Sequence, residues 1–540
     1  MCKLKKFLGN LFIFFLILSS VLPIAPSAKA AFTPVSTHLG VSPSVSMTSS
    51  GTLTTDEVWS GTVNITGDVI VPSGITLTIQ PGTTVRFAAL SHDRHGGSDT
   101  SRCELIINGS LNAVGTPQSP ITFTSSSASP MPNHWAGIRA NVAGAWQTPV
   151  FTLQYAIVEY STSGIVHSMS GTASPPYIGN CTIRYNGSYY GIYLSASGGS
   201  GSARVEGCTI YNNGGYGIYA SGYNGSRSLS ILNNTINNNT QYGIYCDSST
   251  VTLDHNTIHH NNYYGLLCSS TTATITNNEV YSNNNSGIYC TQGSSVINNN
   301  SIHDNTQYGI YIYASGSFTI SISLNNIYNN SGGGIYCNAS SVARLNYNNI
   351  YGGTYALYND SSSAVDARYN WWGAVTTSEM ASGSNPKNIS AIYDIYDNTA
   401  KGTVDYSQWL SAALALTSEP TSYITDPVSG SHVKALSYTI RGVASAGAGV
   451  SRVEVSTDGG STWYTASGTT SWTYNWAIPS EGTYSIKSRA VDNSGITEAP
   501  KDGPTLYIVS LIITTSGTLT TDEVWSGTVN ITGLVLPQYP

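Results

Sequence analysis

The sequence predicts an all-β protein in which a long parallel β-helix is followed by a small β-sandwich. A phrase that combines Asn-rich bends with Gly-Ile-Tyr recurs about every 22 residues through the middle of the chain, which indicates one structural unit stacked many times. Each copy holds two short aliphatic runs separated by Asn and Gly, with no room for a long helix. Beyond about residue 413 the runs lengthen into alternating strands joined by turn residues.

The copies align on their first aliphatic residue, which is Ile183, Ile210, Ile236, Ile258, Val280, Ile302, Ile327 or Ile350. Asn stands three residues after this anchor in seven consecutive copies: Asn186, Asn213, Asn239, Asn261, Asn283, Asn305 and Asn330. Asn also stands two residues before it in six copies, Asn234, Asn256, Asn278, Asn300, Asn325 and Asn348, and the two earliest copies carry Cys181 and Cys208 there.

Stacked copies of one turn form a parallel β-helix whose coils lie about 4.8 Å apart. We expect the aligned Asn side chains to hydrogen-bond along the stack and to satisfy buried polar groups at the bends. Asn and Gly also tolerate the left-handed backbone of sharp turns. A leucine-rich repeat has a similar period, but it needs several Leu per unit, and these copies rarely contain Leu.

The Gly-Ile-Tyr phrase predicts an apolar inner column and an aromatic outer one. Alternation in a strand places Ile and the fourth residue inside and Tyr outside. The inward fourth position includes Cys246, Cys268, Cys290 and Cys337. The outward strip comprises Tyr193, Tyr219, Tyr245, Tyr289, Tyr311 and Tyr336, with Tyr358 at its end. We expect this strip to bind the flat faces of pyranose rings; the alternative is that the stacked rings only stabilise the strands.

The first 30 residues have the features of a secretory signal peptide. Lys3, Lys5 and Lys6 precede an apolar run from 7 to 22 and the small-residue sequence Ala28-Lys29-Ala30, and 31–47 reads as a Ser- and Pro-rich linker. No later stretch is apolar enough to span a membrane, so we expect a secreted or cell-surface protein.

Composition restricts the partners. Cleavage after Ala30 would change the formal charge from −7 to −11, and no Lys lies between Lys29 and Lys387. A nucleic-acid-binding protein needs clustered basic residues, which this chain lacks. Only 9% of the residues are charged, whereas Tyr alone numbers 37. The expected partner is therefore a polysaccharide or a cell-surface glycan, and nothing in the sequence specifies an oligomeric state.

Seven Cys would remain after that cleavage, an odd number for an exported chain. Their periodic placement favours thiols that fill the core, with a reactive thiol or a metal-binding column as the alternatives.

Several phrases resemble those of secreted right-handed β-helix proteins of the pectin-lyase-like superfamily. The strand-rich run from 58 to 87 and its continuation to 168 resemble the opening coils, and 368–374 with 402–410 resemble the closing coils. The resemblance implies a right-handed β-helix over residues 48–412. It is specific to the architecture and not to an activity.

Residues 413–512 are expected to form an immunoglobulin- or fibronectin-like sandwich, because they alternate apolar and polar residues and contain the hairpin signal Asp458-Gly459-Gly460. Phrases such as STDGGSTW resemble bacterial immunoglobulin-like modules. Of Trp463, Trp472 and Trp476, we expect at least one in the core, although a Trp could also bind a ligand. Residues 513–540 are expected to begin a second, truncated β-helix, because 516–533 repeats 50–67 without change; the alternative is a strand that docks on a neighbouring molecule.

The resemblance also raises the question of catalysis, because the superfamily includes lyases with a calcium-binding carboxylate cluster and a basic residue, and hydrolases with paired carboxylates. The eight acids between 150 and 370 are scattered, and no two share a column in adjacent coils. One polar cluster is a weak catalytic candidate, since a His–Asp arrangement supports acid–base chemistry or metal binding. It comprises His259, His260, His303 and Asp304; the alternative is that these are solvated turn residues.

A polar insertion at 91–104 is a second candidate site, because long insertions on a rigid scaffold often carry function. Asp93, Asp99 and Glu104 make calcium possible there, and a mobile surface loop is the alternative; no other cofactor is expected. Taken together, the sequence favours a non-catalytic protein that binds polysaccharide or acts as an adhesive spacer. The alternative is a polysaccharide lyase or glycoside hydrolase on the same fold.

Overall fold

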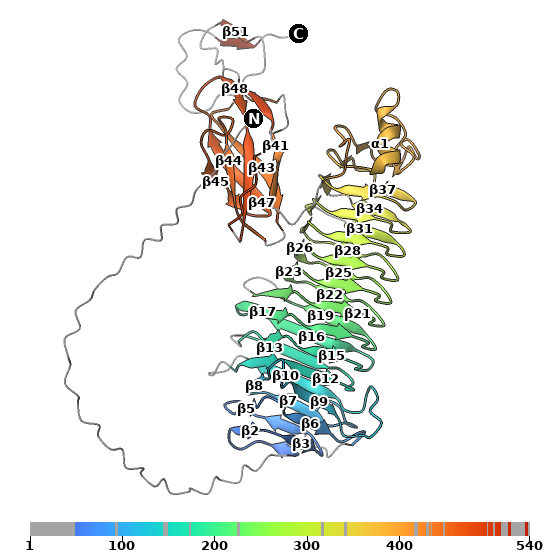
Figure 1. Ribbon diagram of the computed structural model, residues 1–540, viewed down its shortest axis with the longest axis vertical. Helices are drawn as coiled ribbons and strands as arrows, with labels where there is room; N and C mark the ends of the chain where they lie inside the picture. The colour runs from blue at the N-terminus through green and yellow to red at the C-terminus, as the bar shows by residue number, and fades with distance from the viewer. Residues whose placement is uncertain are drawn as a thin grey trace, which may run out of the picture. The chain divides into compact units, whose positions relative to one another are not determined.

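The computed structural model describes residues 49–91, 96–143, 149–171, 174–223, 227–314, 318–339, 343–414, 420–427, 431–433, 435–446, 449–493, 495–500, 503–508, 517–519 and 535–537 (Figure 1). The expected signal peptide and linker lie outside these residues. Within them, three parallel sheets run the length of a stack of coils, each coil contributing one strand to each sheet in turn. A parallel β-helix is therefore confirmed.

Sheet A carries the Gly-Ile-Tyr phrases. Its strands, in spatial order over the described residues, are β1 (Gly51–Thr52), β4 (Val69–Val71), β7 (Glu104–Ile107), β10 (Gly137–Ala143), β13 (Ile165–Ser170), β16 (Tyr190–Ser197), β19 (Tyr216–Ser221), β22 (Ile244–Asp247), β25 (Leu266–Ser269), β28 (Ile288–Thr291), β31 (Tyr308–Ala314), β34 (Gly333–Ala339), β37 (Tyr355–Asn359) and β39 (Ile392–Tyr393).

Sheet B follows sheet A in each coil. Its strands are β2 (Glu57–Trp59), β5 (Thr76–Ile79), β8 (Ser110–Val114), β11 (Phe151–Gln154), β14 (Tyr177–Gly179), β17 (Gly201–Glu206), β20 (Arg227–Leu232), β23 (Thr250–Asp254), β26 (Thr272–Thr276), β29 (Ser295–Asn298), β32 (Ile320–Ser323), β35 (Ala343–Asn346), β38 (Val365–Asp366) and β40 (Val404–Asp405).

Sheet C carries the anchor residues. Its strands are β3 (Thr62–Ile65), β6 (Thr84–Phe87), β9 (Ile121–Ser125), β12 (Ala156–Glu159), β15 (Thr182–Arg184), β18 (Thr209–Tyr211), β21 (Thr235–Asn237), β24 (Thr257–His259), β27 (Glu279–Tyr281), β30 (Ser301–His303), β33 (Asn326–Tyr328) and β36 (Asn349–Tyr351). The helix α1 (Gly373–Ala381) lies beyond β37 at the closing end of the stack (Figure 1).

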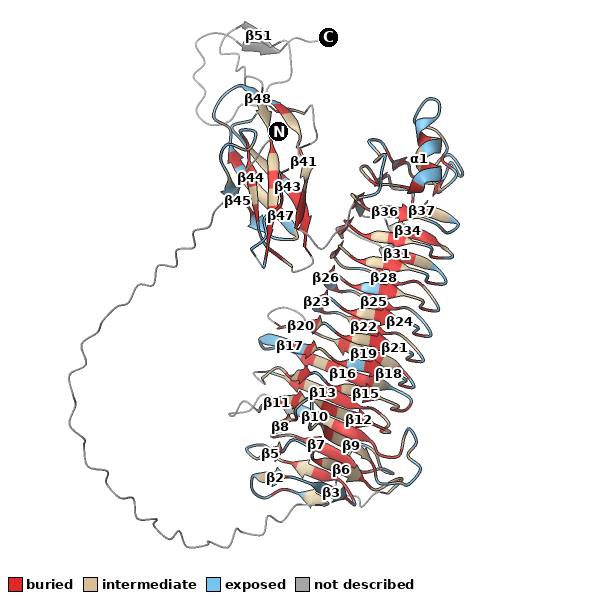
Figure 2. Cartoon of the chain, viewed as in Figure 1, coloured by how far each residue is buried: buried red, intermediate tan, exposed pale blue. Residues whose placement is uncertain are grey.

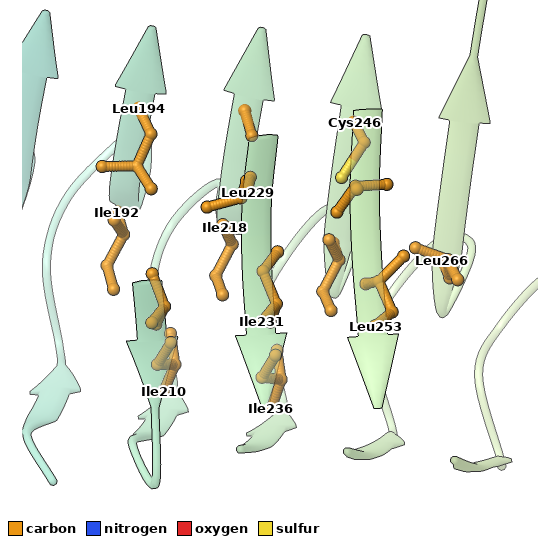
Figure 3. Close-up of a cluster of buried hydrophobic side chains, with 14 of the residues drawn as sticks. Ile192, Leu194, Ile210, Ile218, Leu229, Ile231, Ile236, Cys246, Leu253 and Leu266 are labelled. Carbon is orange, nitrogen blue, oxygen red and sulfur yellow. The ribbon is translucent and has the colours of Figure 1, made fainter. Parts of the chain in front are cut away.

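The interior of the stack is apolar and in register. Ile218, for example, pairs with Ile192 on one side and Ile244 on the other, and all three are fully buried. Figure 3 shows such side chains directed into the space between the sheets, and Figure 2 shows the buried stripes that result. Each buried aliphatic side chain stabilises the fold by roughly 1.5–3 kcal/mol. The four predicted inward cysteines are buried.

In the repeated coils, the bends before and after sheet C each contain a buried Asn, as predicted. After sheet C the Asn186-to-Asn330 column forms a ladder in which each Nδ2 donates to the next Oδ1 at 2.9–3.1 Å. Before sheet C, the column from Asn234 to Asn348 continues to Asn370 with the same spacing. The ladders also accept backbone N–H groups of the preceding coil, so they satisfy the buried polar groups of the bends.

The conformational roles of Asn and Gly differ in part from the expectation. The left-handed residue of each bend directly precedes the ladder Asn, as at Asn238 (φ 52°) before Asn239. The Gly of Gly-Ile-Tyr is required for a different reason. A Cβ on Gly243 would lie 2.6 Å from the Gly265 carbonyl oxygen and 2.8 Å from Asn261 Nδ2, so this Gly allows the next coil to approach.

Residues 421–508 form an antiparallel module of three small sheets. The strands are β41 (Thr421–Asp426), β43 (Ser437–Ser445), β47 (Ser471–Ala477) and β46 (Ser467–Gly468); β42 (His432–Val433), β50 (Thr505–Ile508) and β48 (Gly482–Ser485); and β45 (Tyr464–Thr465), β44 (Val450–Ser456) and β49 (Lys487–Asp492). Within it β42 pairs with β50 in parallel.

The predicted hairpin and core of this module are confirmed. Asp458 joins β44 to β45 and accepts hydrogen bonds from the backbone N–H groups of Ser461 and Thr462 at 3.0 and 2.9 Å. Trp472 and Trp476 are buried in its core, whereas Trp463 is half-buried beneath the Arg489 guanidinium, 4.3 Å from its ring centroid.

Two strands near the end of the chain repeat the opening pairing. The strand β51 (Gly517–Leu519) pairs in parallel with β52 (Val535–Pro537), with Gly517 opposite Val535. In the first coil β1 pairs with β4 in the same way, with Gly51 opposite Val69. The duplicated sequence thus adopts the same strand register twice.

Candidate functional site

The outer surface of sheet A carries the predicted tyrosine strip. Tyr219 lies opposite Tyr193 and Tyr245 in the parallel register, and the same position continues through the later strands. We call these residues the tyrosine face: Tyr193, Tyr219, Tyr245, Tyr289, Tyr311, Tyr336 and Tyr358, extended by Tyr393 in β39 and interrupted by Leu267 in β25.

The rings of this face pack on one another from coil to coil. The ring centroids of Tyr219 and Tyr245 are 4.8 Å apart with planes 13° from parallel, and those of Tyr311 and Tyr336 are 4.4 Å apart at 16°. At the closing end Tyr358 stacks on Tyr393 at 4.1 Å and 4°. These rings are half-buried, because neighbouring rings cover much of their flat surfaces.

A second row of tyrosines runs beside the first and extends the face. Tyr216 stacks on Tyr242 at 5.2 Å with planes 5° from parallel, and it also contacts Tyr219 in its own strand at 5.5 Å. The row comprises Tyr190, Tyr216, Tyr242, Tyr264, Tyr308 and Tyr355. The sequence analysis missed it, although the signal is present: Tyr directly precedes Gly-Ile-Tyr in several copies.

Ring stacking changes the expected mode of recognition. The sequence analysis assigned flat ring surfaces to sugar binding, but inside the two rows those surfaces meet other rings. Phenol hydroxyls and ring edges therefore form the accessible surface there. Larger exposed surfaces belong to three tyrosines at the margins, Tyr189 (57% exposed), Tyr263 (43%) and Tyr313 (49%), which the sequence analysis did not single out.

Two phenols of these rows, Tyr219 and Tyr242, remain neutral at physiological pH. Burial, reinforced by the neighbouring phenols, raises the pKa of Tyr219 and of Tyr242 to about 12. Their hydroxyls can therefore both donate and accept hydrogen bonds at any physiological pH.

Few charges lie on this surface. Next to the tyrosines, the outward column of described residues reads Ser168, Ser195, Ser221, Asp247, Ser269, Thr291, Tyr313, Asn338 and Asp360. Asp360 accepts a hydrogen bond from Tyr336 Oη at 2.6 Å and pairs with Lys401. Burial alone would raise the pKa of Asp360, but the hydrogen bonds from Lys401 and Tyr336 outweigh burial and lower it.

The predicted histidine cluster lies on sheet C, away from the tyrosine face. The Tyr281 ring separates His259 from His303, with centroids 4.8 and 5.2 Å away and nearly parallel planes. The column continues from His303 to Tyr328 at 4.7 Å and on to Tyr351 at 5.4 Å. His259 and His303 thus act as rings in an aromatic stack.

Local contacts of these histidines are with turn residues. His260 and Asp304 have left-handed backbone at the bend, with φ 53° and 54°. His303 Nδ1 lies 2.8 Å from Asp304 Oδ2, and its Nε2 lies 3.7 Å from Glu279 Oε1. Burial, together with the neighbouring His260, lowers the pKa of His259. The structure does not bring the four predicted residues together around one point.

The polar insertion does not assemble the predicted calcium ligands among the described residues. Asp93 lies outside them. Asp99 accepts hydrogen bonds from Ser101 and Arg102, whereas Glu104 is buried and accepts from Ser98 N at 2.6 Å and Arg139 Nε at 3.2 Å. Burial raises the pKa of Glu104 despite Arg139. No group of three or more His, Cys, Asp or Glu side chains that could hold a metal ion occurs in the described part of the chain.

Comparisons with known proteins agree with the architecture. A family model described as right handed beta helix region matches 120–280, 163–321 and 222–371, and a pectate-lyase like beta helix domain matches 47–156. A bacterial Ig domain matches 420–487. The chain is therefore a right-handed parallel β-helix repeat protein with a C-terminal bacterial immunoglobulin-like module.

Solved structures that resemble the chain do so at low identity. A mutant of the periplasmic alginate epimerase AlgG is 15% identical, with 53% of this chain and 72% of that chain covered and a TM-score of 0.40. The pectate lyase Pel9A is 15% identical over 59% and 81%, with a TM-score of 0.33. The Siphovirus 9NA tailspike receptor binding domain is 10% identical over 82% and 84%, with a TM-score of 0.37. No curated protein matches the chain.

Proposed function

We propose that this protein is exported and binds neutral polysaccharide, without catalysis, through the tyrosine face. The observation that carries the proposal is the pair of adjoining tyrosine rows along the outer surface of one sheet. A rigid parallel sheet fixes these side chains at a regular spacing of about 4.8 Å per coil.

The chemistry of the face suits a hydroxyl-rich polymer. Neutral phenol hydroxyls and the adjacent Ser column both donate and accept hydrogen bonds, as sugar hydroxyls do. The exposed rings of Tyr189, Tyr263 and Tyr313 offer apolar surface to the C–H side of a pyranose ring. Each contact is weak, but a long polymer engages many of them at once.

The charge of the face favours a neutral polymer over a polyuronate. Among the described outward residues of the sheet A strands from Val166 to Tyr358, the acid is Asp247, and Lys and Arg do not occur; Asp360 follows directly after β37. A polyuronate carries a carboxylate on every unit, and these would approach Asp247 and Asp360, while Lys401 is already paired with Asp360.

Export remains part of the proposal. It is supported by the basic and apolar first 30 residues, which lie outside the described part of the chain. Within that part, no helix reaches the length and apolarity needed to cross a bilayer. Sequencing the N-terminus of the protein recovered outside the expressing cells tests export: a start at Ala31 is expected, and retention of Met1 inside the cells would contradict it.

Binding is tested by retention of the purified chain on immobilised neutral polymers (glucans, xylans and mannans) and on polyuronates. We expect retention by at least one neutral polymer and loss of roughly tenfold in affinity in the triple variant Tyr189→Ser, Tyr263→Ser, Tyr313→Ser. The matched control is Tyr328→Ser in the sheet C stack, which should bind as well as the parent. Equal binding by the triple variant, or preferential binding of polyuronates, would contradict the proposal.

The absence of catalysis is tested in the same samples. We expect no new reducing ends and no unsaturated uronate ends after long incubation with either class of polymer, with or without calcium. Release of such ends by the parent chain, and not by a heat-inactivated sample, would show that the protein is an enzyme.

A further inference from the structure

We propose that the closing coil holds a second, separate site that binds a single neutral sugar ring. The coil contains a pocket of about 350 Å³ that is lined by residues in and around β40 and by loop residues that follow α1. Its walls include Pro386, Tyr396, Asp405, Tyr406 and Trp409. This volume falls in the range of roughly 300–1,000 Å³ that is usual for small-molecule sites.

Hydrogen bonds hold the aromatic floor of the pocket in place. The Tyr406 side chain is 4% exposed. Its hydroxyl donates to Asn385 Oδ1 at 2.9 Å and accepts from the Lys387 N–H at 2.8 Å. The Trp409 ring, half-buried, lies 6.3 Å from the Tyr406 ring, centroid to centroid. The floor is therefore formed before any ligand arrives.

Two further groups give the pocket a polar and an apolar side. Asp405 Oδ1 accepts a hydrogen bond from the Ser407 N–H at 3.0 Å, and Asp405 Oδ2 lies 3.6 Å from Arg368 Nε. These contacts hold the carboxylate in one orientation, while the Asp405 side chain stays 53% exposed. The Tyr396 ring is 46% exposed beside the pocket. An anchored carboxylate can accept hydrogen bonds from two hydroxyl groups of one ligand.

These features select the class of ligand. An apolar floor of aromatic rings with one anchored carboxylate complements a pyranose ring, which has an apolar C–H surface and a hydroxyl-bearing rim. A uronate would meet the Asp405 carboxylate with like charge. Arg368 lies 3.6 Å from that carboxylate but is held more closely by Asp366, at 2.9 Å, so the test includes an organic cation as a probe. The proposal shares with the proposed function only the neutral-sugar class of ligand, since none of its wall residues belongs to the tyrosine face.

The test uses the full chain and saturation-transfer-difference NMR with the methyl glycosides of glucose, galactose, mannose and xylose. Glucuronic acid and benzylamine serve as the charged probes. We expect saturable binding of at least one neutral glycoside and weaker binding of both charged probes. Failure of all four glycosides to saturate, or tighter binding of either charged probe, would overturn the proposal.

Two variants assign the binding to this pocket. Asp405→Asn should weaken the glycoside by roughly tenfold, because it removes a charged hydrogen-bond acceptor. Trp409→Ala should abolish it, with the thermal melt measured to exclude loss of folding. The control Val375→Ser changes a side chain on α1 that is 84% exposed and outside the pocket walls, so it should bind as the parent does. Unchanged binding by Asp405→Asn would overturn the proposal.

The same variants separate this proposal from the proposed function. Both pocket variants should still be retained on long neutral polymers through the tyrosine face. The triple variant of Tyr189, Tyr263 and Tyr313 should still bind the glycoside. In the parent chain, glycoside binding without retention on any neutral polymer would contradict the proposed function alone. Retention on polymer without glycoside binding would contradict the pocket alone.

Discussion

At the residue scale, single buried polar side chains determine whether the coils stay in register. Asn261 accepts hydrogen bonds from Asn239 N and Asn239 Nδ2 at 3.2 and 3.0 Å and donates to Asn283 Oδ1 at 3.1 Å. Replacing it with Ala leaves several buried groups unpaired, each at a cost of about 1–3 kcal/mol.

We therefore expect Asn261→Ala to lower the free energy of unfolding of the β-helix by about 2–4 kcal/mol. Urea titration of the chain measures this change. The control is the next residue, Asn262, which is exposed, and Asn262→Ala should change the unfolding free energy by less than about 0.5 kcal/mol. Equal effects of the two substitutions would show that the Asn ladder does not make this contribution to the free energy of unfolding.

His167 gives the interior a dependence on pH. It lies on the inner side of β13, opposite Ala140 and Leu194, and neither ring nitrogen has a hydrogen-bond partner. Burial, together with the nearby positive charge of Arg227, lowers its pKa to about 3. Between about 6.5 and 3 the unfolded chain binds a proton at this residue that the folded chain does not, so stability falls as the pH falls.

Over that range His167 should contribute a slope of roughly 1.4 kcal/mol per pH unit to the unfolding free energy. We expect His167→Leu, which matches the Leu194 of the next coil, to reduce the loss of stability between pH 7 and pH 4. Urea midpoints at the two pH values provide the measurement. An equal loss of stability between pH 7 and pH 4 in the parent and the variant would contradict the lowered pKa of His167.

The buried cysteines should be chemically inert in the folded protein. Burial raises the pKa of Cys246 to about 12, so its reactive thiolate form is scarce at neutral pH. All seven described cysteines are buried. We expect iodoacetamide to label them only after denaturation, as read by peptide mass spectrometry. Rapid labelling of the Cys246 peptide in the native state would show that the coil opens there.

At the element scale, the two kinds of tyrosine should separate stability from binding. Tyr245 packs against Tyr219 of the tyrosine face and Tyr242 of the second row, whereas Tyr263 is 43% exposed. Aromatic pairs contribute about 0.5–1.5 kcal/mol beyond the area they bury. We expect Tyr245→Ser to lower the unfolding free energy by about 1–3 kcal/mol, and Tyr263→Ser to change mainly polymer affinity. Thermal melts and retention on polymer, measured on both variants, distinguish the two roles. A Tyr263→Ser variant with a lowered melting temperature and normal polymer binding would contradict the binding role of Tyr263.

The periodic elements could be predicted because their residues recur at fixed offsets. The Asn at the third position after each anchor forms the expected ladder, since one offset repeated in every coil becomes one column in space. The row that includes Tyr216 was not predicted, because the alternation of inward and outward side chains was applied only from the Gly of Gly-Ile-Tyr onward. The coverage of ring surfaces was also missed, because side-chain orientation depends on neighbouring coils and not on strand alternation.

The closing pocket lies beyond what the repeat pattern can indicate. Tyr396, Asp405 and Trp409 follow the last regular copies, and no period relates them. Tertiary packing of the loop residues that follow α1 against those around β40 brings them together. Similarly, the Gly243 position was expected to favour a turn, whereas its role is to admit the neighbouring backbone and Asn261.

At the scale of the whole molecule, stacking converts short repeats into one continuous surface. A single coil contributes one or two tyrosines, which bind a sugar weakly, but the registered strands of sheet A align these contacts along one polymer. The central claim is that polymer lies along the tyrosine face.

Hydroxyl-radical labelling of tyrosine side chains, with and without saturating neutral polysaccharide, tests this claim most directly. When polymer is bound, labelling should fall strongly at Tyr189, Tyr263 and Tyr313. Labelling of Tyr464 in the immunoglobulin-like module, which is 49% exposed, should not change. Protection of Tyr464 with unchanged labelling of Tyr189, Tyr263 and Tyr313 would contradict the claim.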